Sequence, residues 1–315
     1  MKVFLAGATG AIGKRLVPLL VKAGHTVTGT TRSESKAGSL RAAGATPAVL
    51  NALNRDEVLD AVRQSMPDAV IHQLTAITDI DFRHFDRAFA ETNRLRTEGT
   101  DHLLAAAHAV NCRRFIAQSY TGWPYARVGG PVKTEEDPLD PNPPAGLRTT
   151  LDAIRYLEQA VTNAAGIDGI VLRYGGFYGP GNAIGEGGST VEQIRKRKVP
   201  IIDGGTGIWS FIHIDDAAGA TLAALENGTK GIYNIADDEP APVSEWLPAL
   251  AADLGAKPPR RIPTWLARLV AGEVAVVMMT ESRGASNAKA KRELGWKLKW
   301  PTWREGFKNG LADQD

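Results

Sequence analysis

The stretch AGATGAIG, residues 6–13, decides the fold, because three glycines stand at fixed spacing after an apolar run and at the start of a helix-like pattern. Gly7 permits a tight turn, Gly10 lets the backbone approach a ligand, and Gly13 lets the following helix pack closely on the strand. The first turn of a helix also presents unpaired N–H groups to an anion. The stretch therefore predicts a strand, a turn and a helix that bind the pyrophosphate of a dinucleotide.

Outward from this turn, short β-rich runs alternate with longer amphipathic ones, among them a predicted helix through residues 86–109. The runs KVFLA (2–6) and AVIHQL (69–74) are apolar on both faces, which is typical of parallel strands covered by helices on each side. We therefore expect an α/β fold with a doubly wound parallel sheet. Ligands of such sheets bind beyond the carboxyl ends of the strands.

Charge and composition exclude several classes of partner. Thirty-seven basic residues against 35 acidic ones leave a formal charge of +2 without a long basic run, so nothing favours nucleic acid or an anionic membrane surface. The most apolar late stretch, Leu266 to Met279, is interrupted by Arg268 and Glu273 and is too short to span a bilayer. Neither HExxH nor paired CxxC occurs, so no metal is implied. We expect a cytoplasmic protein with a small-molecule partner.

The end of the second predicted strand, Thr30-Thr31-Arg32-Ser33, distinguishes between cofactors. An acidic side chain there would accept from the ribose hydroxyls of NAD, whereas an arginine pairs with a 2′-phosphate. No acid stands at the tip itself, and Glu34 lies further along. The stretch favours NADP(H), with NAD as the alternative.

Further motifs resemble the extended and atypical short-chain dehydrogenases/reductases, the NAD(P)-dependent epimerase/dehydratase family. The resemblance covers nearly the whole chain and is far more specific than the glycines alone. Its parts are GATGAIG (7–13), AVIHQLTA (69–76), Asn93, RFIAQS (114–119), LRYGGFYGPGN (172–182), FIHIDDAA (211–218), GIYNIA (231–236) and KAKRELGWK (289–297).

This resemblance implies a Rossmann-type domain of residues 1–177, which regains about residues 211–236, and a smaller C-terminal substrate-binding domain of residues 178–210 and 237–315. It leaves open a homodimer through helices near residues 92–110 and 150–165. Together with the glycine turn, it implies a set of cofactor-binding residues. They are Gly7, Thr9, Gly10, Ala11, Ile12, Gly13, Arg32, Leu74, Thr75, Ala76, Asn93 and Tyr174.

The chain departs from the family at its catalytic pair, a tyrosine four residues before a lysine. The lysine holds the nicotinamide ribose and lowers the pKa of the tyrosine. None of the six tyrosines here is followed by a lysine at that spacing, and no lysine occurs between Lys133 and Lys196. Alignment on Glu158 places Thr150 at the tyrosine position and Ile154 at the lysine position. The usual proton relay is therefore absent.

Tyr120, near the family's serine/threonine position, is the predicted replacement, with Thr150 as its hydroxyl partner and Ser119 beside it. A neutral tyrosine can still donate a proton during reduction. The pocket for the substrate is expected to use aromatic side chains. These are Trp123, Tyr125, Tyr178 and Trp209.

We therefore expect an enzyme, an NADP(H)-dependent oxidoreductase that acts on a carbonyl or conjugated carbonyl compound. Two alternatives stay open. One is an epimerase, dehydratase or other isomerase acting on a sugar-like substrate with a cofactor that is recycled within each turnover. The other is a non-catalytic protein that senses NADP(H), which the missing lysine supports.

Overall fold

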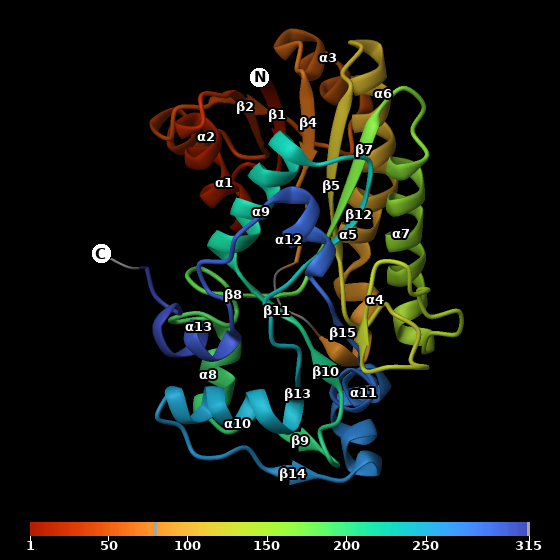
Figure 1. Cartoon of the computed structure of the whole chain (residues 1–315), viewed down its shortest axis with the longest axis vertical. Helices are drawn as coiled ribbons and strands as arrows, with labels where there is room; N and C mark the ends of the chain where they lie inside the picture. Colours follow the sequence, from red (N-terminus) through yellow and green to blue (C-terminus); the bar gives the residue numbers. More distant parts are fainter. Residues whose placement is uncertain (78–80, 314–315) are drawn as a thin grey trace.

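The computed structural model describes residues 1–77 and 81–313. Its centre is a sheet of seven parallel strands, and the strand order changes direction between β1 and β4 (Figure 1). Across the sheet the strands are β12 (Gly231–Ile235), β7 (Asp168–Tyr174), β5 (Arg114–Tyr120), β4 (Ala69–His72), β1 (Lys2–Ala6), β2 (Thr26–Thr31) and β3 (Thr46–Val49). The prediction of a doubly wound parallel sheet is confirmed.

Helices cover both faces of this sheet, which explains why its strands are apolar on both sides. Successive residues of β1 alternate between two cores, Leu5 facing one and Phe4 the other. One face carries α1 (Ala11–Lys22), α2 (Glu34–Ala42), α9 (Ile214–Asn227) and α12 (Ala288–Leu294). The opposite face carries α3 (Arg55–Ser65), α6 (Thr100–Ala109) and α7 (Ala145–Thr162).

A second region lies beyond the carboxyl ends of the strands, in the lower half of Figure 1. Its own core joins aromatic side chains, among them Trp246, Trp303 and Phe307. Its helices are α8 (Ser189–Arg195), α10 (Val243–Asp253), α11 (Thr264–Thr280) and α13 (Trp303–Asn309). Its paired strands are β8 (Gly176–Tyr178) with β11 (Phe211–His213), β9 (Ile201–Ile202) with β14 (Arg261–Ile262), and β10 (Ile208–Trp209) with β13 (Ala241–Pro242). A further pair, β6 (Val132–Lys133) with β15 (Gly284–Ala285), runs beside them. The predicted assignment of residues 237–315 to the second domain stays a prediction. Within that range, α12 packs on the central sheet.

The helix predicted through residues 86–109 is interrupted by changes in winding. A 3₁₀ turn η1 (Phe82–His84) leads into α4 (Phe85–Ala88) and α5 (Ala90–Arg94), and a π-helical turn η2 (Leu95–Gly99) joins these to α6. A π turn holds an additional residue and therefore changes the direction of the side chains around it. The part of this helix that precedes α6 is called the 82–99 segment below.

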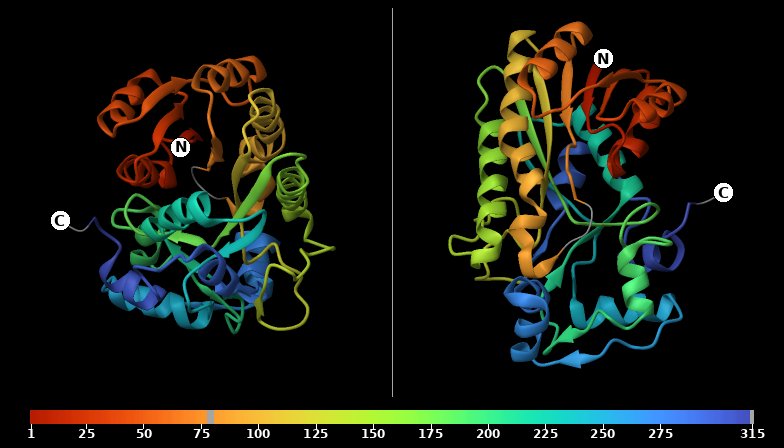
Figure 2. Two further views of the ribbon diagram at one scale, coloured as in Figure 1. Left: turned by 45° about the horizontal axis from the view of Figure 1, so that its top comes forward. Right: turned by 180° about the vertical axis from the view of Figure 1, so that it is seen from behind.

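Two views from other sides show the same arrangement, with α6 and α7 side by side along the sheet and the second region at the far ends of the strands (Figure 2). In the described part of the chain, no helix has both the length and the apolar character needed to cross a membrane.

Candidate active site

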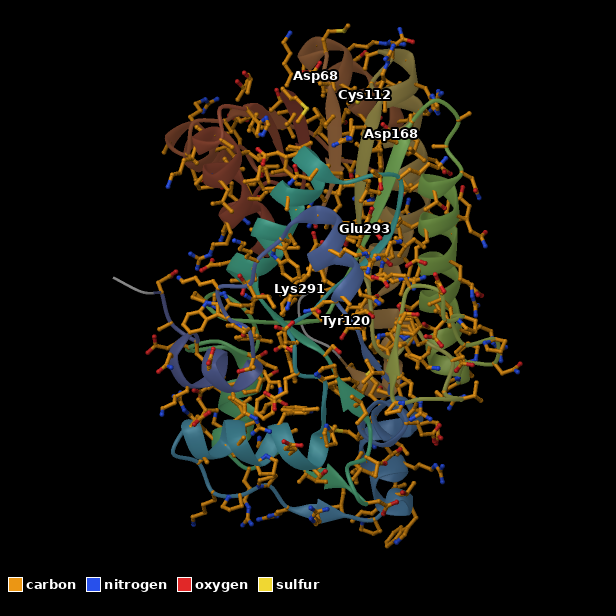
Figure 3. The ribbon with its side chains drawn as sticks, viewed as in Figure 1. Asp68, Cys112, Tyr120, Asp168, Lys291 and Glu293 are labelled. Carbon is orange, nitrogen blue, oxygen red and sulfur yellow. The ribbon has the colours of Figure 1, made fainter. Side chains whose placement is uncertain are left out.

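A cavity of about 970 Å³ extends from the glycine turn at residues 7–13 into the second region. It opens at the carboxyl ends of β1, β4 and β5, which is the position where doubly wound sheets bind ligands. Tyr120 ends β5 near the middle of the molecule, whereas Cys112 lies at the opposite end of the strand (Figure 3). The cavity is therefore reached by Tyr120 but not by the lone cysteine.

The glycine turn has the geometry that the sequence predicts. Gly7 has a φ of +92°, and a Cβ on it would lie 2.6 Å from the carbonyl oxygen of Gln73. A Cβ on Gly13 would lie 2.3 Å from the Gly7 oxygen, so this glycine serves close packing of α1. The N-terminus of α1 has no side-chain cap, which leaves its first N–H groups to face the cavity. These features suit a phosphate group.

At the end of the cavity beside the glycine turn, the tip of β2 supplies Thr30, Thr31 and Arg32. The N–H of Gly7 donates to Thr30 Oγ1 at 3.0 Å, which ties the turn to β2. Arg32 is exposed, and its Nη1 lies 2.5 Å from Glu91 Oε1. Lys36, on α2, adds a second cation to this part of the lining. Arg32 after β2 and Lys36 on α2 thus place two positive charges at this end of the cavity, with Glu91 as an acidic partner of Arg32.

The loop after β4 is held from behind by a buried histidine. His72 Nε2 donates to the Leu95 carbonyl at 3.1 Å, and the N–H of Leu74 donates to His72 Nδ1 at 3.2 Å. Burial lowers the pKa of His72 to about 4, so the ring is neutral at physiological pH. It fixes the loop against the 82–99 segment.

Most of the predicted cofactor residues line the cavity, and four do not. Gly13 packs behind the turn, and the N–H of Ala76 donates to Thr92 Oγ1 at 3.0 Å. Asn93 lies behind the wall, and the Tyr174 hydroxyl is bonded to Thr221 and Gln73 in the core. The predicted residues that do line it are Gly7, Thr9, Gly10, Ala11, Ile12, Arg32, Leu74 and Thr75.

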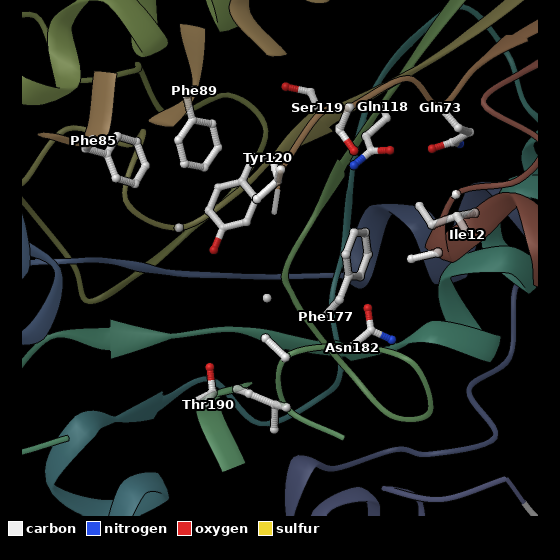
Figure 4. A pocket seen from close by; sticks show the side chains of 18 of the residues that line it. Ile12, Gln73, Phe85, Phe89, Gln118, Ser119, Tyr120, Phe177, Asn182 and Thr190 are labelled. Carbon is white, nitrogen blue, oxygen red and sulfur yellow. The ribbon is translucent and has the colours of Figure 1, made fainter. Parts of the chain in front are cut away.

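The end of β5 brings Tyr120 into the cavity. Figure 4 shows its hydroxyl directed into the open space, with Phe85 and Phe89 on one side and Phe177 across from it. Among the described residues the hydroxyl makes no hydrogen bond, and burial raises its pKa to about 12 against the opposing effect of Arg96. Ser119 also reaches the cavity, but its Oγ donates to Glu158 Oε1 at 2.7 Å. Tyr120 thus presents its hydroxyl to the cavity, whereas the Ser119 hydroxyl is bonded to Glu158.

In the alignment on Glu158, helix α7 takes the place of the helix that carries the family's catalytic pair. It contributes no residue to the cavity lining. Thr150 Oγ1 donates to Asp86 Oδ1 at 2.8 Å and accepts from Asn93 Nδ2 at 3.0 Å. Ile154 is buried. The predicted pair of Tyr120 with Thr150 is therefore not brought together at the cavity wall, and the catalytic role of Thr150 gains no support from its position.

Arg96 is a lining residue that the sequence did not single out. It lies at the start of the π turn, is 6% exposed, and its Nη1 is 3.5 Å from Asn93 Oδ1. Burial lowers the pKa of its guanidinium to about 10, although the nearby charge of Glu158 opposes this. In the sequence, Arg96 is marked only by its place three residues after Asn93. The family's tyrosine and lysine motif does not include this position.

The inner part of the cavity is apolar and aromatic. Trp123 and Trp209 line it as predicted, and Trp209 Nε1 donates to the Met278 carbonyl at 2.8 Å. Tyr125 and Tyr178 do not reach it. Tyr125 is fully buried between Arg173 and Asn234, and Tyr178 packs against Phe307. The other apolar lining residues include Phe82, Phe85, Phe89, Ile202, Ala275, Met278 and Met279.

Comparisons with known proteins agree with this geometry. The model of the NAD dependent epimerase/dehydratase family matches residues 3–236. The 3-diazoavenalumate denitrifying reductase of a Streptomyces species is 43% identical over 308 residues, covering 98% of this chain and 99% of that protein.

Two solved structures share the fold. UDP-glucose 4-epimerase of Thermotoga maritima, with UDP-glucose, superposes with a TM-score of 0.76 at 22% identity and covers 99% of this chain and 97% of that one. A human epimerase family protein with NADPH gives 0.74 at 21% identity and covers 99% of both chains. The resemblance seen in the motifs is confirmed. The chain belongs to the NAD-dependent epimerase/dehydratase family and is an NAD(P)-dependent enzyme, an oxidoreductase or epimerase of the short-chain dehydrogenase/reductase type.

Proposed function

We propose that the protein is an NADP(H)-dependent reductase that transfers hydride to a carbonyl or conjugated carbonyl group of a small, largely apolar molecule. One observation carries this proposal: the Tyr120 hydroxyl, which has no hydrogen-bond partner in the described part of the chain, faces the cavity that also contains the glycine turn. A cofactor whose pyrophosphate lies at α1 would extend past β4 toward β5. The aromatic inner part of the cavity then receives the substrate.

The preference for NADP(H) rests on the tip of β2. Arg32 and Lys36 line the cavity there, with Ser33 between them. A 2′-phosphate would compete with Glu91 for the guanidinium, and because this ion pair is exposed it is weak. NADPH should therefore bind more tightly than NADH, and the difference should shrink as salt is added.

The chemistry needs one hydride and one proton. NADPH, when bound, would supply the hydride for the carbonyl carbon, and Tyr120 would donate its proton to the oxygen, so that an alcohol forms. Since the pKa of Tyr120 is raised to about 12, the phenol stays protonated at neutral pH and acts as a donor rather than a base. This assignment favours reduction over oxidation in that pH range.

The test is a screen for NADPH oxidation with aldehydes, ketones and enones, repeated with Tyr120→Phe. For the substrates that react, turnover should fall about 100-fold, because a positioned general acid contributes on the order of 10²–10⁴. The dissociation constant for NADPH should not change. Tyr156→Phe, an exposed tyrosine on α7, is the matched control. An unchanged rate in Tyr120→Phe would remove the assignment, and substrate conversion without net NADPH oxidation would favour an epimerase.

A second candidate function is reductive removal of a diazo group, which the Streptomyces relative favours. Hydride added to the terminal nitrogen of an aryl diazonium ion gives a neutral diazene, which releases N₂ and leaves the hydrogen on the ring carbon. No oxyanion forms, so no proton donor is needed, and the missing lysine would cost little. Here Tyr120→Phe should leave the rate unchanged, which separates this reaction from carbonyl reduction.

A further inference from the structure

Arg96 is a buried cation at the wall of the cavity. Among the described residues it makes no ion pair, and its one hydrogen bond is the long contact with Asn93 Oδ1 at 3.5 Å. A guanidinium has five N–H donors, and a buried charge with few partners is costly. Its remaining donors are available to a molecule that enters the cavity.

The acidic group whose charge acts on Arg96 is already engaged. Glu158 accepts from Arg173 Nη2 at 2.6 Å and from Arg173 Nε at 2.8 Å, and it also accepts from Ser119. Its charge is therefore shared with a closer guanidinium in a bidentate pair. The charge of Glu158 raises the pKa of Arg96 through space, without a hydrogen bond between the two side chains.

The position of Arg96 along the cavity points to one ligand. The 82–99 segment is tied to the loop after β4 through His72 and Thr92, so Arg96 lies at the level where β4 and β5 end. Leu74 and Thr75 line the same cavity, and Tyr120 is close enough for the charge of Arg96 to lower the pKa of its phenol against the effect of burial. An extended dinucleotide that starts at the glycine turn would bring its second ribose to this point.

We propose that Arg96 binds the hydroxyls of the nicotinamide ribose and supplies, from the 82–99 segment, the cation that α7 lacks. This inference rests on the proposed function, because it requires an NADP(H) cofactor in the cavity. Two ribose oxygens can accept from the two ends of one guanidinium. The same charge lies beside Tyr120 and stabilises a negative oxygen at that site.

The test compares two ligands that differ in the nicotinamide half. Calorimetry with NADPH and with adenosine 2′,5′-bisphosphate would be run on the wild type, Arg96→Met and Arg96→Lys. Arg96→Met should weaken NADPH about 10- to 100-fold, the range expected for charged hydrogen bonds. Adenosine 2′,5′-bisphosphate should bind within twofold of the wild type, and Arg96→Lys should recover part of the loss.

Arg94→Met is the matched control, because Arg94 lies on the same segment, is exposed and pairs with Glu98 at 2.8 Å. It should bind both ligands as the wild type does. Unchanged NADPH affinity in Arg96→Met, with a raised KM for the substrate, would overturn the proposal in favour of a substrate-binding role. Equal weakening of both ligands would overturn it as a folding defect. Failure of the wild type to bind either ligand would instead contradict the proposed function itself.

Discussion

Helix α7 and the 82–99 segment pack against each other beside the sheet, yet only the segment reaches the cavity. The inward polar groups of α7, Thr150 and Glu158, are bonded to other protein groups. The segment instead presents Arg96, Phe85 and Phe89 to the open space. The 82–99 segment thus forms the cavity wall, and α7 supports that wall from behind.

If α7 is the helix that carries the catalytic pair in the family, as the alignment on Glu158 predicts, then it keeps a structural role without that pair. Glu158 connects α7 to β5 through Ser119 and to β7 through Arg173, and Arg173 continues to Tyr125 at 2.9 Å. A network of this kind holds its strands in place whether or not chemistry occurs on the helix. The cavity wall itself is formed by groups on the neighbouring 82–99 segment.

The largest expected effect comes from cutting the network of α7. Glu158→Leu would leave the Arg173 guanidinium buried without its carboxylate, and such a loss costs about 3–5 kcal/mol of unfolding free energy. Urea unfolding measures it. If α7 only supports the fold, the molecules that remain folded should keep turnover within a few-fold of the wild type.

Asp152→Asn is the control for that variant, because Asp152 also lies on α7 but forms an exposed pair with Arg155. Its effect should stay under about 1 kcal/mol. A stable Glu158→Leu protein with abolished turnover would contradict the division of roles, since α7 would then act in catalysis after all.

A smaller loss of unfolding free energy is expected at acidic pH, and it concerns the contact between His72 and the 82–99 segment. The pKa of His72 is lowered to about 4 in the fold, whereas a histidine in the unfolded chain titrates near its ordinary pKa of 6.5. Between these values the unfolded chain takes up the proton and the folded one does not. The contribution of neutral His72 to the unfolding free energy is thus fully present above pH 6.5. It falls by about 3 kcal/mol as the pH drops to 4.

The measurement is the unfolding free energy from pH 7 to 4 for the wild type and His72→Gln. The glutamine amide can still donate to the Leu95 carbonyl but does not titrate, so its curve should be flatter by about 3 kcal/mol over this range. Hydrogen exchange should show the 82–99 segment opening before α7. Parallel curves for the two proteins would mean that His72 is not the group that anchors the segment.

The sheet and the glycine turn could be predicted because their signals are local. Gly7 and Gly13 stand where their own strand and helix require them, and the apolar runs of β1 and β4 report burial on both faces. The place of Arg32 in the cavity lining could be predicted for the same reason, since the tip of β2 follows directly from the position of the turn. None of these predictions depends on how distant segments pack.

The residues of the inner cavity wall could not be predicted in this way. Their identity depends on which side of each strand or helix borders the cavity. In β8, Phe177 lines the cavity while the next residue, Tyr178, points into the core, as alternation along a strand requires. The motif includes both and does not say which side is open. Arg96 was missed because its place depends on the π turn, which no periodicity in the sequence announced.

The smallest effect, and the sharpest test of the comparison, concerns Thr150, the hydroxyl that the alignment places at the catalytic position. Thr150→Val removes its bonds to Asp86 and Asn93, which should cost about 1–2 kcal/mol of unfolding free energy. Because the hydroxyl faces away from the cavity, turnover should stay within about threefold of the wild type, on the basis that no transition-state contact is lost. Thr149→Val, at an exposed neighbouring site, controls for the added methyl group. A fall of 100-fold in turnover at unchanged stability would return the chemistry to α7, since only a hydroxyl in contact with the reacting atoms has that effect without weakening the fold.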